Sequence, residues 1–338
     1  MEEYFKLQQQ IAPELIAIIE YRYAILRSVY RFQPIGRRSL AQNLDLSERT
    51  VRKHIKFLEE QNFLKASNAG SKITRRGQRI LKGLDGYIKQ LRGTSDLENK
   101  LSNLLNIEVY VVPSGLNYEQ SQKELGRFAA IFIKDLISAE DIIAVTGGTT
   151  LATVAEMMNR GQERKDVTVI PARGGLGEGV EIQSNTITAK IANKLGGKYK
   201  LLHIPDNLRQ ETIFKLIEER TIKEVLELAR QADILIHGIG TAKVMAKSRK
   251  IQAEKIEKLE HRKAVGESFG YYFNHQGEIV YSTPSVGLKL SDLDRVDKVI
   301  AVAGGKNKAE SILAVVSAGY QDILLTDEEA GKAILKQA

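Results

Sequence analysis

Two glycine-rich stretches carry residue types that bind anions. Gly147-Gly148-Thr149-Thr150 follows an apolar run and opens an amphipathic one; Gly304-Gly305-Lys306 follows another apolar run, with Lys308 two residues further on. Free backbone N–H groups at a helix N-terminus, beside hydroxyl or ammonium groups, form an anion site. A single Gly-Gly pair is usually only a turn. Because the pattern recurs, the two loops together predict a site for a ligand with an anion at each end.

The apolar runs predict the sheet that positions these loops. From residue 107 onward, unbroken Val/Ile/Leu strings alternate with helical stretches, as expected of strands covered on both faces. The runs are 107–112, 141–148, 167–175, 199–205, 232–240, 298–305 and 322–327, and the helical stretches are 118–137, 151–158, 182–195, 222–230 and 309–317. This pattern predicts a doubly wound α/β domain with a mainly parallel sheet, interrupted by a hairpin at 266–282. Ligands bind beyond the C-terminal strand ends of such sheets, where Arg173-Gly174-Gly175 and His237-Gly238-Ile239-Gly240 join the two loops.

Other chemistries have little support in this sequence. There is no cysteine, which excludes disulfides, a Cys nucleophile and Cys-based metal sites. No histidines are paired at ligand spacing and no P-loop occurs, so we expect no metal site, no cofactor and no ATP hydrolysis of that type. Gly266-Glu267-Ser268-Phe269-Gly270 matches a nucleophile elbow, but a hairpin follows where that motif needs a helix. We therefore assign no catalytic residue.

The excess positive charge lies in the first quarter of the chain. The net charge is +8; residues 1–92 hold 18 Lys+Arg and 9 Asp+Glu, and the remainder holds 32 and 33. A polyanion is therefore the natural partner of residues 1–92, although a solubilising basic arm is the simpler alternative. The chain starts with no signal peptide and contains no membrane-length apolar run, so we expect a cytoplasmic protein without a membrane partner.

The same quarter has the pattern of a winged helix-turn-helix. A helix is expected over 14–31 and a short one near Leu40, and Ser47 can cap a third helix. In that third helix Val51, Ile55 and Leu58 face one way and the cations face the other, as in a helix lying in the DNA major groove. Two short strands around residues 68–70 make the wing. The candidate DNA-binding residues are Arg37, Arg38, Ser47, Arg49, Thr50, Arg52, Lys53, Lys56 and Lys72. A helical hairpin for protein contact is the alternative. We expect a DNA-binding domain at 1–92 and a ligand-binding and oligomerisation domain at 93–338.

Several stretches, taken together, resemble a known family. They are 35–64, AVTGGTT (144–150), VIPARGGLGE (169–178), HGIG (237–240), ESFGYYFN (267–274) and IAVAGG (300–305). In their order along the chain and in their residues they are similar, over essentially the full length, to the sugar-responsive repressors related to the sorbitol-operon regulator. The resemblance implies a repressor of a glycolytic operon in Gram-positive bacteria. It also implies a ligand-binding domain that looks like sugar-phosphate isomerases and deaminases but works without turnover.

The resemblance further implies an effector and its contacts. The effector would be fructose 1,6-bisphosphate, with related sugar phosphates also able to bind. The stretch Gly147–Thr150 would hold one phosphate, and Glu267 would accept hydrogen bonds from sugar hydroxyls. The second phosphate and the sugar would be held by Arg173, Gln183, Arg249 and Lys308.

Two other functions remain open on the sequence alone. An isomerase-like or deaminase-like enzyme with a DNA-binding head would need a general base, for which Glu267 and His237 are the only candidates. A constitutive DNA-binding protein would ignore metabolites. For the repressor, a homodimer or homotetramer would space several heads on double-stranded operator DNA.

Overall fold

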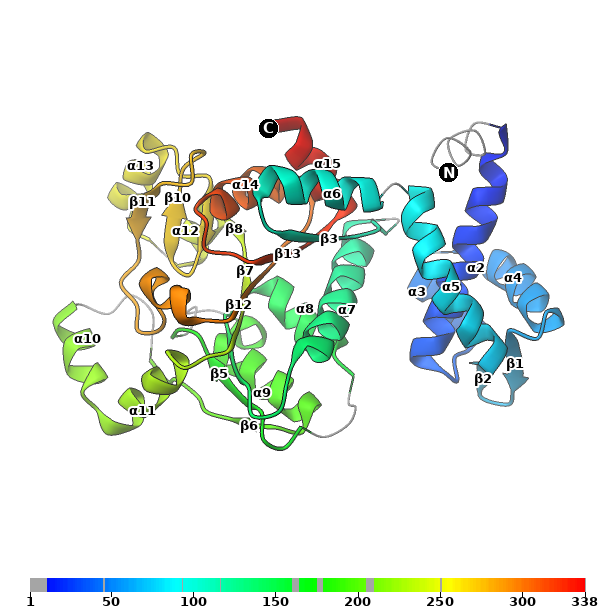
Figure 1. Cartoon of the computed structure of the whole chain (residues 1–338), viewed down its shortest axis with the longest axis horizontal. Coiled ribbons are helices and arrows are strands. Elements are labelled where there is room, and N and C mark those ends of the chain that lie inside the picture. The colour runs from blue at the N-terminus through cyan, green and yellow to red at the C-terminus, as the bar shows by residue number, and fades with distance from the viewer. Residues whose placement is uncertain are drawn as a thin grey trace. The chain divides into compact units, whose positions relative to one another are not determined.

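The computed structural model describes residues 11–44, 46–92, 94–115, 117–159, 164–174, 179–204, 210–249 and 251–337. The chain divides into two compact units, Met1–Asp96 and Leu97–Ala338. This division falls four residues beyond the expected boundary between 92 and 93. Each unit has its own hydrophobic core. Figure 1 shows the helices and strands of both units.

The described residues of the first unit form four helices and a two-stranded hairpin. The elements are α2 (Pro13–Phe32), α3 (Arg37–Leu44), α4 (Glu48–Glu60), β1 (Leu64–Ser67), β2 (Gly70–Ile73) and α5 (Arg75–Arg92). Ser47 caps α4, since its Oγ accepts a hydrogen bond from the backbone N–H of Thr50 at 3.1 Å. Val51, Ile55 and Leu58 are buried in the core of this unit. Ile35 extends the wing by pairing with Ser71, so the hairpin is joined to the segment that precedes α3.

The second unit is built on a seven-stranded parallel sheet. The strands are β3 (Glu108–Val112), β4 (Ile142–Val145), β5 (Thr168–Pro171), β6 (Lys198–Tyr199), β7 (Ile234–Gly238), β12 (Lys298–Val302) and β13 (Ile323–Asp327). Their order in the sheet is β3-β13-β12-β7-β4-β5-β6, and every pair is parallel. From β4 the chain builds outward to β6 and then returns to β7 on the other side of β4. The topological switch point is therefore between β4 and β7.

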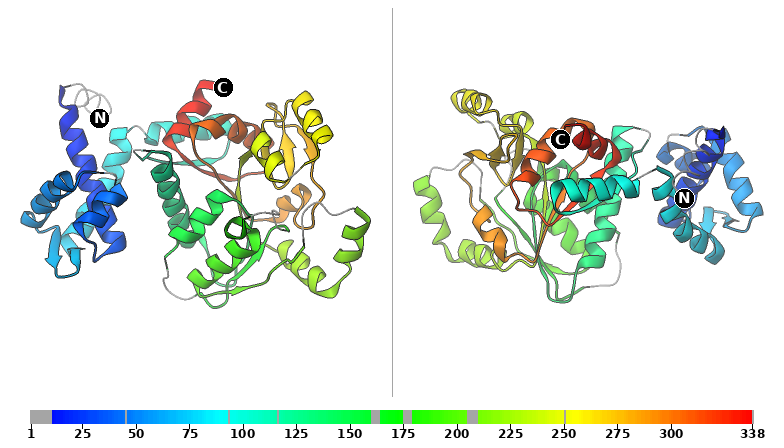
Figure 2. Two further views of the ribbon diagram at one scale, coloured as in Figure 1. Left: turned by 180° about the vertical axis from the view of Figure 1, so that it is seen from behind. Right: turned by 45° about the horizontal axis from the view of Figure 1, so that its top comes forward.

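Helices cover both faces of this sheet, as a doubly wound fold requires. One face packs against α7 (Tyr118–Leu136), α8 (Thr149–Met157) and α9 (Ser184–Leu195). The other packs against α6 (Thr94–Leu105), α11 (Arg220–Ala229), α14 (Ala309–Ser317) and α15 (Glu328–Gln337). Figure 2 shows these layers from behind and from above. The remaining helices are α10 (Gln210–Ile217), α12 (Ala242–Ser248) and α13 (Ala253–His261), with short 3-10 turns η1 (Val180–Ile182), η2 (Leu290–Arg295) and η3 (Lys306–Lys308).

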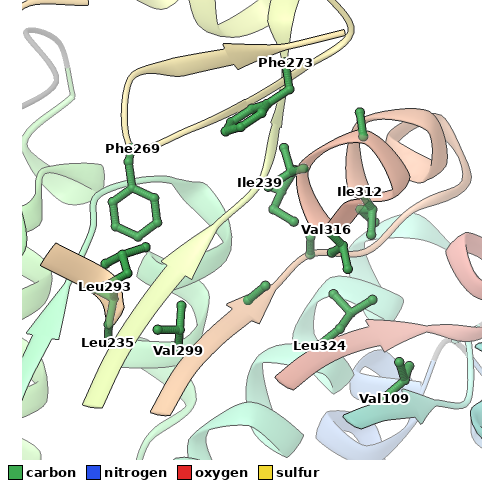
Figure 3. Close-up of a cluster of buried hydrophobic side chains, with 14 of the residues drawn as sticks. Val109, Leu235, Ile239, Phe269, Phe273, Leu293, Val299, Ile312, Val316 and Leu324 are labelled. Atoms are coloured by element: carbon green, nitrogen blue, oxygen red, sulfur yellow. The ribbon is translucent and has the colours of Figure 1, made fainter. Parts of the chain in front are cut away.

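The expected hairpin is part of a small antiparallel sheet above the C-terminal edge of the large one. Its order is β11 (Ile279–Ser282), β10 (Tyr271–Phe273), β9 (Gly266–Ser268) and β8 (Gly240–Thr241). Phe269 and Phe273 point from this sheet into the same core as Ile239 and Leu293 (Figure 3). The small sheet is thereby fixed over the end of β7.

One expectation differs from the structure. Of the described residues in the apolar run 199–205, only Tyr199 belongs to a strand, β6, at the outer edge of the sheet. Leu202 and Ile204 are instead buried in a separate cluster against α11. The leucines after residue 96 belong to α6, whose Ser102 and Glu98 side chains accept hydrogen bonds from the backbone N–H groups of β3.

Among the described residues, no helix is both long and apolar enough to cross a membrane.

Candidate functional site

A cavity of about 570 Å³ opens at the switch point of the large sheet. Its walls come from the loop after β4, the loop after β7, the segment after β5, the small sheet and η3. These are the glycine-rich strand ends that the sequence grouped on one edge. The location agrees with the general rule that open α/β sheets bind ligands where the strand order reverses.

The N-terminus of α8 supplies one anion-binding wall. Gly148 precedes the helix with φ of +123°, which favours glycine, and no side chain caps the first turn. Thr149 is exposed and Thr150 is buried, and both line the cavity. Backbone N–H groups without an internal partner, two hydroxyls and the positive end of the helix dipole make this wall suitable for a phosphate.

Buried arginines supply the second wall. Arg173 and Arg249 are 3% and 5% exposed and both line the cavity. Arg249 Nη2 donates to Glu267 Oε1 at 2.9 Å, and the Gly270 backbone N–H donates to the same oxygen at 2.5 Å. A Cβ on Gly270 would lie 2.3 Å from Arg173 Nη1, so the Arg173 side chain lies against the same turn. The segment from β9 to the turn after it therefore contacts both arginines, Arg249 through Glu267 and Arg173 at Gly270.

The described residues that line the cavity carry a net positive charge. Among its described lining residues, three are cationic (Arg173, Arg249 and Lys308) and one is anionic (Glu267). Glu267 Oε2 has no hydrogen bond within the described parts of the chain, so this oxygen can accept a bond from a ligand hydroxyl. Two excess positive charges, a helix N-terminus and one free carboxylate oxygen match a polyhydroxylated ligand with anionic ends.

Eight of the nine candidate effector-binding residues line this cavity: Gly147, Gly148, Thr149, Thr150, Arg173, Arg249, Glu267 and Lys308. Gln183 does not. It is the N-cap residue of α9, while its neighbours Ile182 and Ser184 line the wall. Lys306 is exposed and outside the lining, so Lys308 is the lysine that the loop after β12 presents. Gly175 and Lys250 lie outside the described residues.

Sequence reasoning missed several lining residues. Tyr118 begins α7, Asn307 lies in η3, and Ile239, Val244 and Met245 form an apolar wall. Asn307 was within a loop already singled out. Ile239 was likewise within a strand end already singled out, whereas no local pattern marked Tyr118, Val244 and Met245, because their role arises only when distant elements meet at the sheet edge.

Eight of the nine candidate DNA-binding residues are exposed on the surface of the first unit, and the ninth, Thr50, is half-buried. Arg49, Arg52, Lys53 and Lys56 are exposed on α4, opposite its buried stripe. A groove between α4 and the wing is lined by Arg37, Arg52 and Lys56 together with residues 66–71. Lys72 is exposed on β2.

Three of these residues have additional structural roles. Ser47 and Thr50 are hydrogen bonded to each other at the start of α4, with 2.8 Å between their hydroxyl oxygens. Arg38 forms an ion pair with Glu48, with 3.2 Å between Arg38 Nε and Glu48 Oε1. The sequence reasoning had not considered this acidic partner. Both partners of this pair are largely exposed, so it contributes little stability and Arg38 can exchange Glu48 for a phosphate.

Comparison with known proteins gives the family of the chain. Residues 18–88 match the family described as "CggR N-terminal DNA binding domain", and residues 89–336 match the "Putative sugar-binding domain". The central glycolytic genes regulator of Priestia megaterium (strain DSM 319 / IMG 1521) is 43% identical over 99% of each chain, and that of Bacillus subtilis (strain 168) is 41% identical over 99% of each. The chain belongs to the family of central glycolytic genes regulators.

Solved structures of this family's relatives have the same ligand-binding fold. A SorC family transcriptional regulator from Enterococcus faecalis matches 71% of this chain and 99% of its own length, with a TM-score of 0.66 and 38% identity. The resemblance and fold class that the sequence indicated are confirmed. As a member of this family, the chain is a DNA-binding and sugar-binding transcription regulator and not an enzyme.

The two residues considered as a general base differ in position: Glu267 lines the cavity, and His237 belongs to the core. His237, one of two residues considered as a general base, does not line the cavity. It is fully buried beneath Phe269, and its Nδ1 lies 2.9 Å from Ser268 Oγ. Burial lowers the pKa of His237 to about 4. The histidine is therefore neutral near pH 7 and belongs to the core.

This burial predicts acid sensitivity of the second unit. In the unfolded chain the imidazole titrates near its usual pKa of 6.5, whereas the folded state keeps it neutral down to about pH 4. Between these values the unfolded state binds more protons, so stability falls as pH drops from 6.5 to 4, by about 3 kcal/mol from this group. In His237→Asn, the urea concentration at the unfolding midpoint should change less with pH between 6.5 and 4 than it does in the wild type. His261 is exposed, so His261→Gln should show the same dependence of the midpoint on pH as the wild type. If His237→Asn also kept the wild-type dependence, the buried neutral His237 would not be its cause.

Proposed function

We propose that this chain, as a homo-oligomer, represses glycolytic genes and leaves its operator when fructose 1,6-bisphosphate binds. The observation that carries the proposal is the cavity with two separate anion-binding walls, the N-terminus of α8 and the buried arginines beside Glu267. A sugar with a phosphate at each end satisfies both walls at once. The names of the relatives support the glycolytic genes as the target.

The residue roles follow from this pose. Thr149 and Thr150, with the preceding glycines, hold one phosphate. Arg173, Arg249 and Lys308 hold the other phosphate and the sugar, and Glu267 Oε2 accepts a sugar hydroxyl. Gln183 remains a candidate only if the side chain turns toward the cavity on ligand binding, since it is the one proposed residue outside the lining.

Release requires the effector to favour one state of the protein over another. A ligand with equal affinity for both states shifts nothing. A bisphosphate that bridges loops from β4, β5, β9 and β12 favours the arrangement in which both walls are occupied. Coupling of about 1–3 kcal/mol per site is typical, and an oligomer sums that coupling over its sites.

Operator release tests the proposal directly. Operator-bound protein is titrated with fructose 1,6-bisphosphate, fructose 6-phosphate and fructose, and the bound fraction is followed by fluorescence anisotropy. We expect release by the bisphosphate at the lowest concentration, by the monophosphate only at higher concentration, and no release by fructose. A complex that is unaffected by all three, with an unchanged melting temperature, would favour a DNA-binding protein that ignores metabolites.

Substitution of Arg52 tests DNA binding separately from effector binding. Arg52 is exposed on α4 and lines the groove beside the wing. Arg52→Ala should therefore weaken operator binding by about tenfold. The slope of the logarithm of the binding constant against the logarithm of salt concentration should become shallower by about one. The thermal shift with fructose 1,6-bisphosphate should remain as in the wild type. Arg220→Ala removes an exposed arginine of the second unit that pairs with Glu224 and should change neither quantity. Unaltered operator affinity in Arg52→Ala would remove this residue from the interface.

A further inference from the structure

The groove between α4 and the wing contains an acidic side chain, Glu59. The groove has a volume of about 680 Å³, and its described lining holds three cations, Arg37, Arg52 and Lys56, and this one acid. Glu59 is half-buried in the last turn of α4. It follows Arg52 by seven residues and Lys56 by three, so all three side chains lie on the same side of the helix. A carboxylate therefore interrupts the cationic lining of the groove.

The other two acids of α4 are paired with cations, whereas Glu59 is not. Arg38 Nε lies 3.2 Å from Glu48 Oε1. Lys56 Nζ lies 3.9 Å from Glu60 Oε1. Within the described parts of the chain, the carboxylate of Glu59 has neither an ion pair nor a hydrogen bond. No polar contact among the described residues therefore accounts for an acid at this position.

A carboxylate beside DNA has two effects of opposite sign. It repels the phosphate backbone, and this repulsion is the same for every sequence. At a base edge in the major groove, a carboxylate also accepts a hydrogen bond from the N4 amino group of cytosine. The repulsion is offset only where the sequence presents such an amino group. One acid among cations therefore discriminates between DNA sequences.

We propose that Glu59 determines part of the operator specificity, because it disfavours other DNA and accepts a hydrogen bond from a cytosine amino group in the operator. The inference rests on the operator binding proposed above and does not depend on the effector. Arg52 and Lys56, on the same side of α4, attract the phosphates of any sequence. Glu59 reduces that general attraction and replaces part of it with a contact that only the operator provides.

The test compares two dissociation constants of the full chain, one for the operator duplex and one for a duplex with the same bases in scrambled order. Both are measured by fluorescence anisotropy at one salt concentration. Glu59→Ala should bind the scrambled duplex about threefold more tightly, because a repulsive charge is removed. It should bind the operator about threefold more weakly, because the base contact is lost. The ratio of the two constants, which measures specificity, should therefore fall by about tenfold.

Glu14→Ala is the matched control, since it makes the same change in net charge outside the groove. Glu14 is exposed in the first turn of α2 and does not line the groove. Its specificity ratio should equal that of the wild type. A base-pair scan, in which each C·G pair of the operator is replaced by T·A, then locates the contact. One replacement should weaken wild-type binding by about tenfold and leave Glu59→Ala binding unchanged.

A specificity ratio in Glu59→Ala within about twofold of the wild-type ratio would overturn the inference. If both duplexes were bound more tightly to the same extent, Glu59 would act through net charge alone. If neither constant changed, the carboxylate would not reach DNA. Should Glu59→Ala fail to fold, Glu59→Gln keeps the size of the side chain, removes its charge and takes its place. Wild-type protein without a preference for the operator would overturn the proposed function together with the inference.

Discussion

Replacing both Thr149 and Thr150 by alanine should abolish release by fructose 1,6-bisphosphate and leave operator binding intact. Both hydroxyls line the cavity at the uncapped start of α8. A hydrogen bond to a charged group contributes about 1.5–3 kcal/mol, so loss of two should raise the Kd by at least about a hundredfold. Alanine is a good helix former, so α8 itself should remain. The DNA-binding residues belong to the other compact unit, which is why operator affinity should not change.

The measurement is operator release, with the Kd of the bisphosphate determined in parallel. Thr153→Ala is the matched control, since Thr153 lies one turn later on α8, its hydroxyl bonds to the Thr149 carbonyl, and it does not line the cavity. This variant should respond as the wild type does. If Thr149→Ala/Thr150→Ala still leaves the operator at the wild-type concentration of fructose 1,6-bisphosphate, the phosphate is not bound at α8.

Features that depend on local chemistry were predictable from the sequence. Ser47 has the side chain of an N-cap and acts as one. The unbroken apolar run of β4 predicted a strand buried on both faces, and Ile143 and Ala144 belong to opposite cores. The glycine loops follow such strands, so their meeting at one sheet edge followed from parallel topology.

Features that depend on contacts between distant elements were not predictable. In β7, His237 shares a face with Leu235 because side chains alternate along a strand, but the sequence does not say that Phe269 covers that face. The pairing of Arg249 with Glu267 joins α12 to β9, and it determines which oxygen of Glu267 remains for a ligand.

Glu267→Ala should cause a large loss of stability in the second unit. Glu267 and Arg249 have side chains 4% and 3% exposed, and the Glu267 carboxylate also accepts from the Gly270 N–H. Alanine removes the carboxylate and keeps the guanidinium buried, which typically costs about 3–5 kcal/mol. The loss should appear as a lower urea midpoint for the unit formed by residues 97–338. Glu254→Ala, which breaks an exposed pair with Lys258 on α13, should leave the midpoint unchanged.

The double variant Glu267→Ala/Arg249→Met distinguishes a buried charge from a simple loss of packing. If the cost of Glu267→Ala comes from the guanidinium that has lost its carboxylate, replacing Arg249 by an apolar side chain should recover part of the stability, and the double variant should unfold at higher urea than Glu267→Ala alone. If the cost comes from packing, the two losses should add. Both variants should lose the response to fructose 1,6-bisphosphate, because Glu267 and Arg249 line the cavity. A Glu267→Ala protein with the wild-type midpoint would mean that the ion pair contributes nothing to holding the turn after β9. The second anion-binding wall would then need another support.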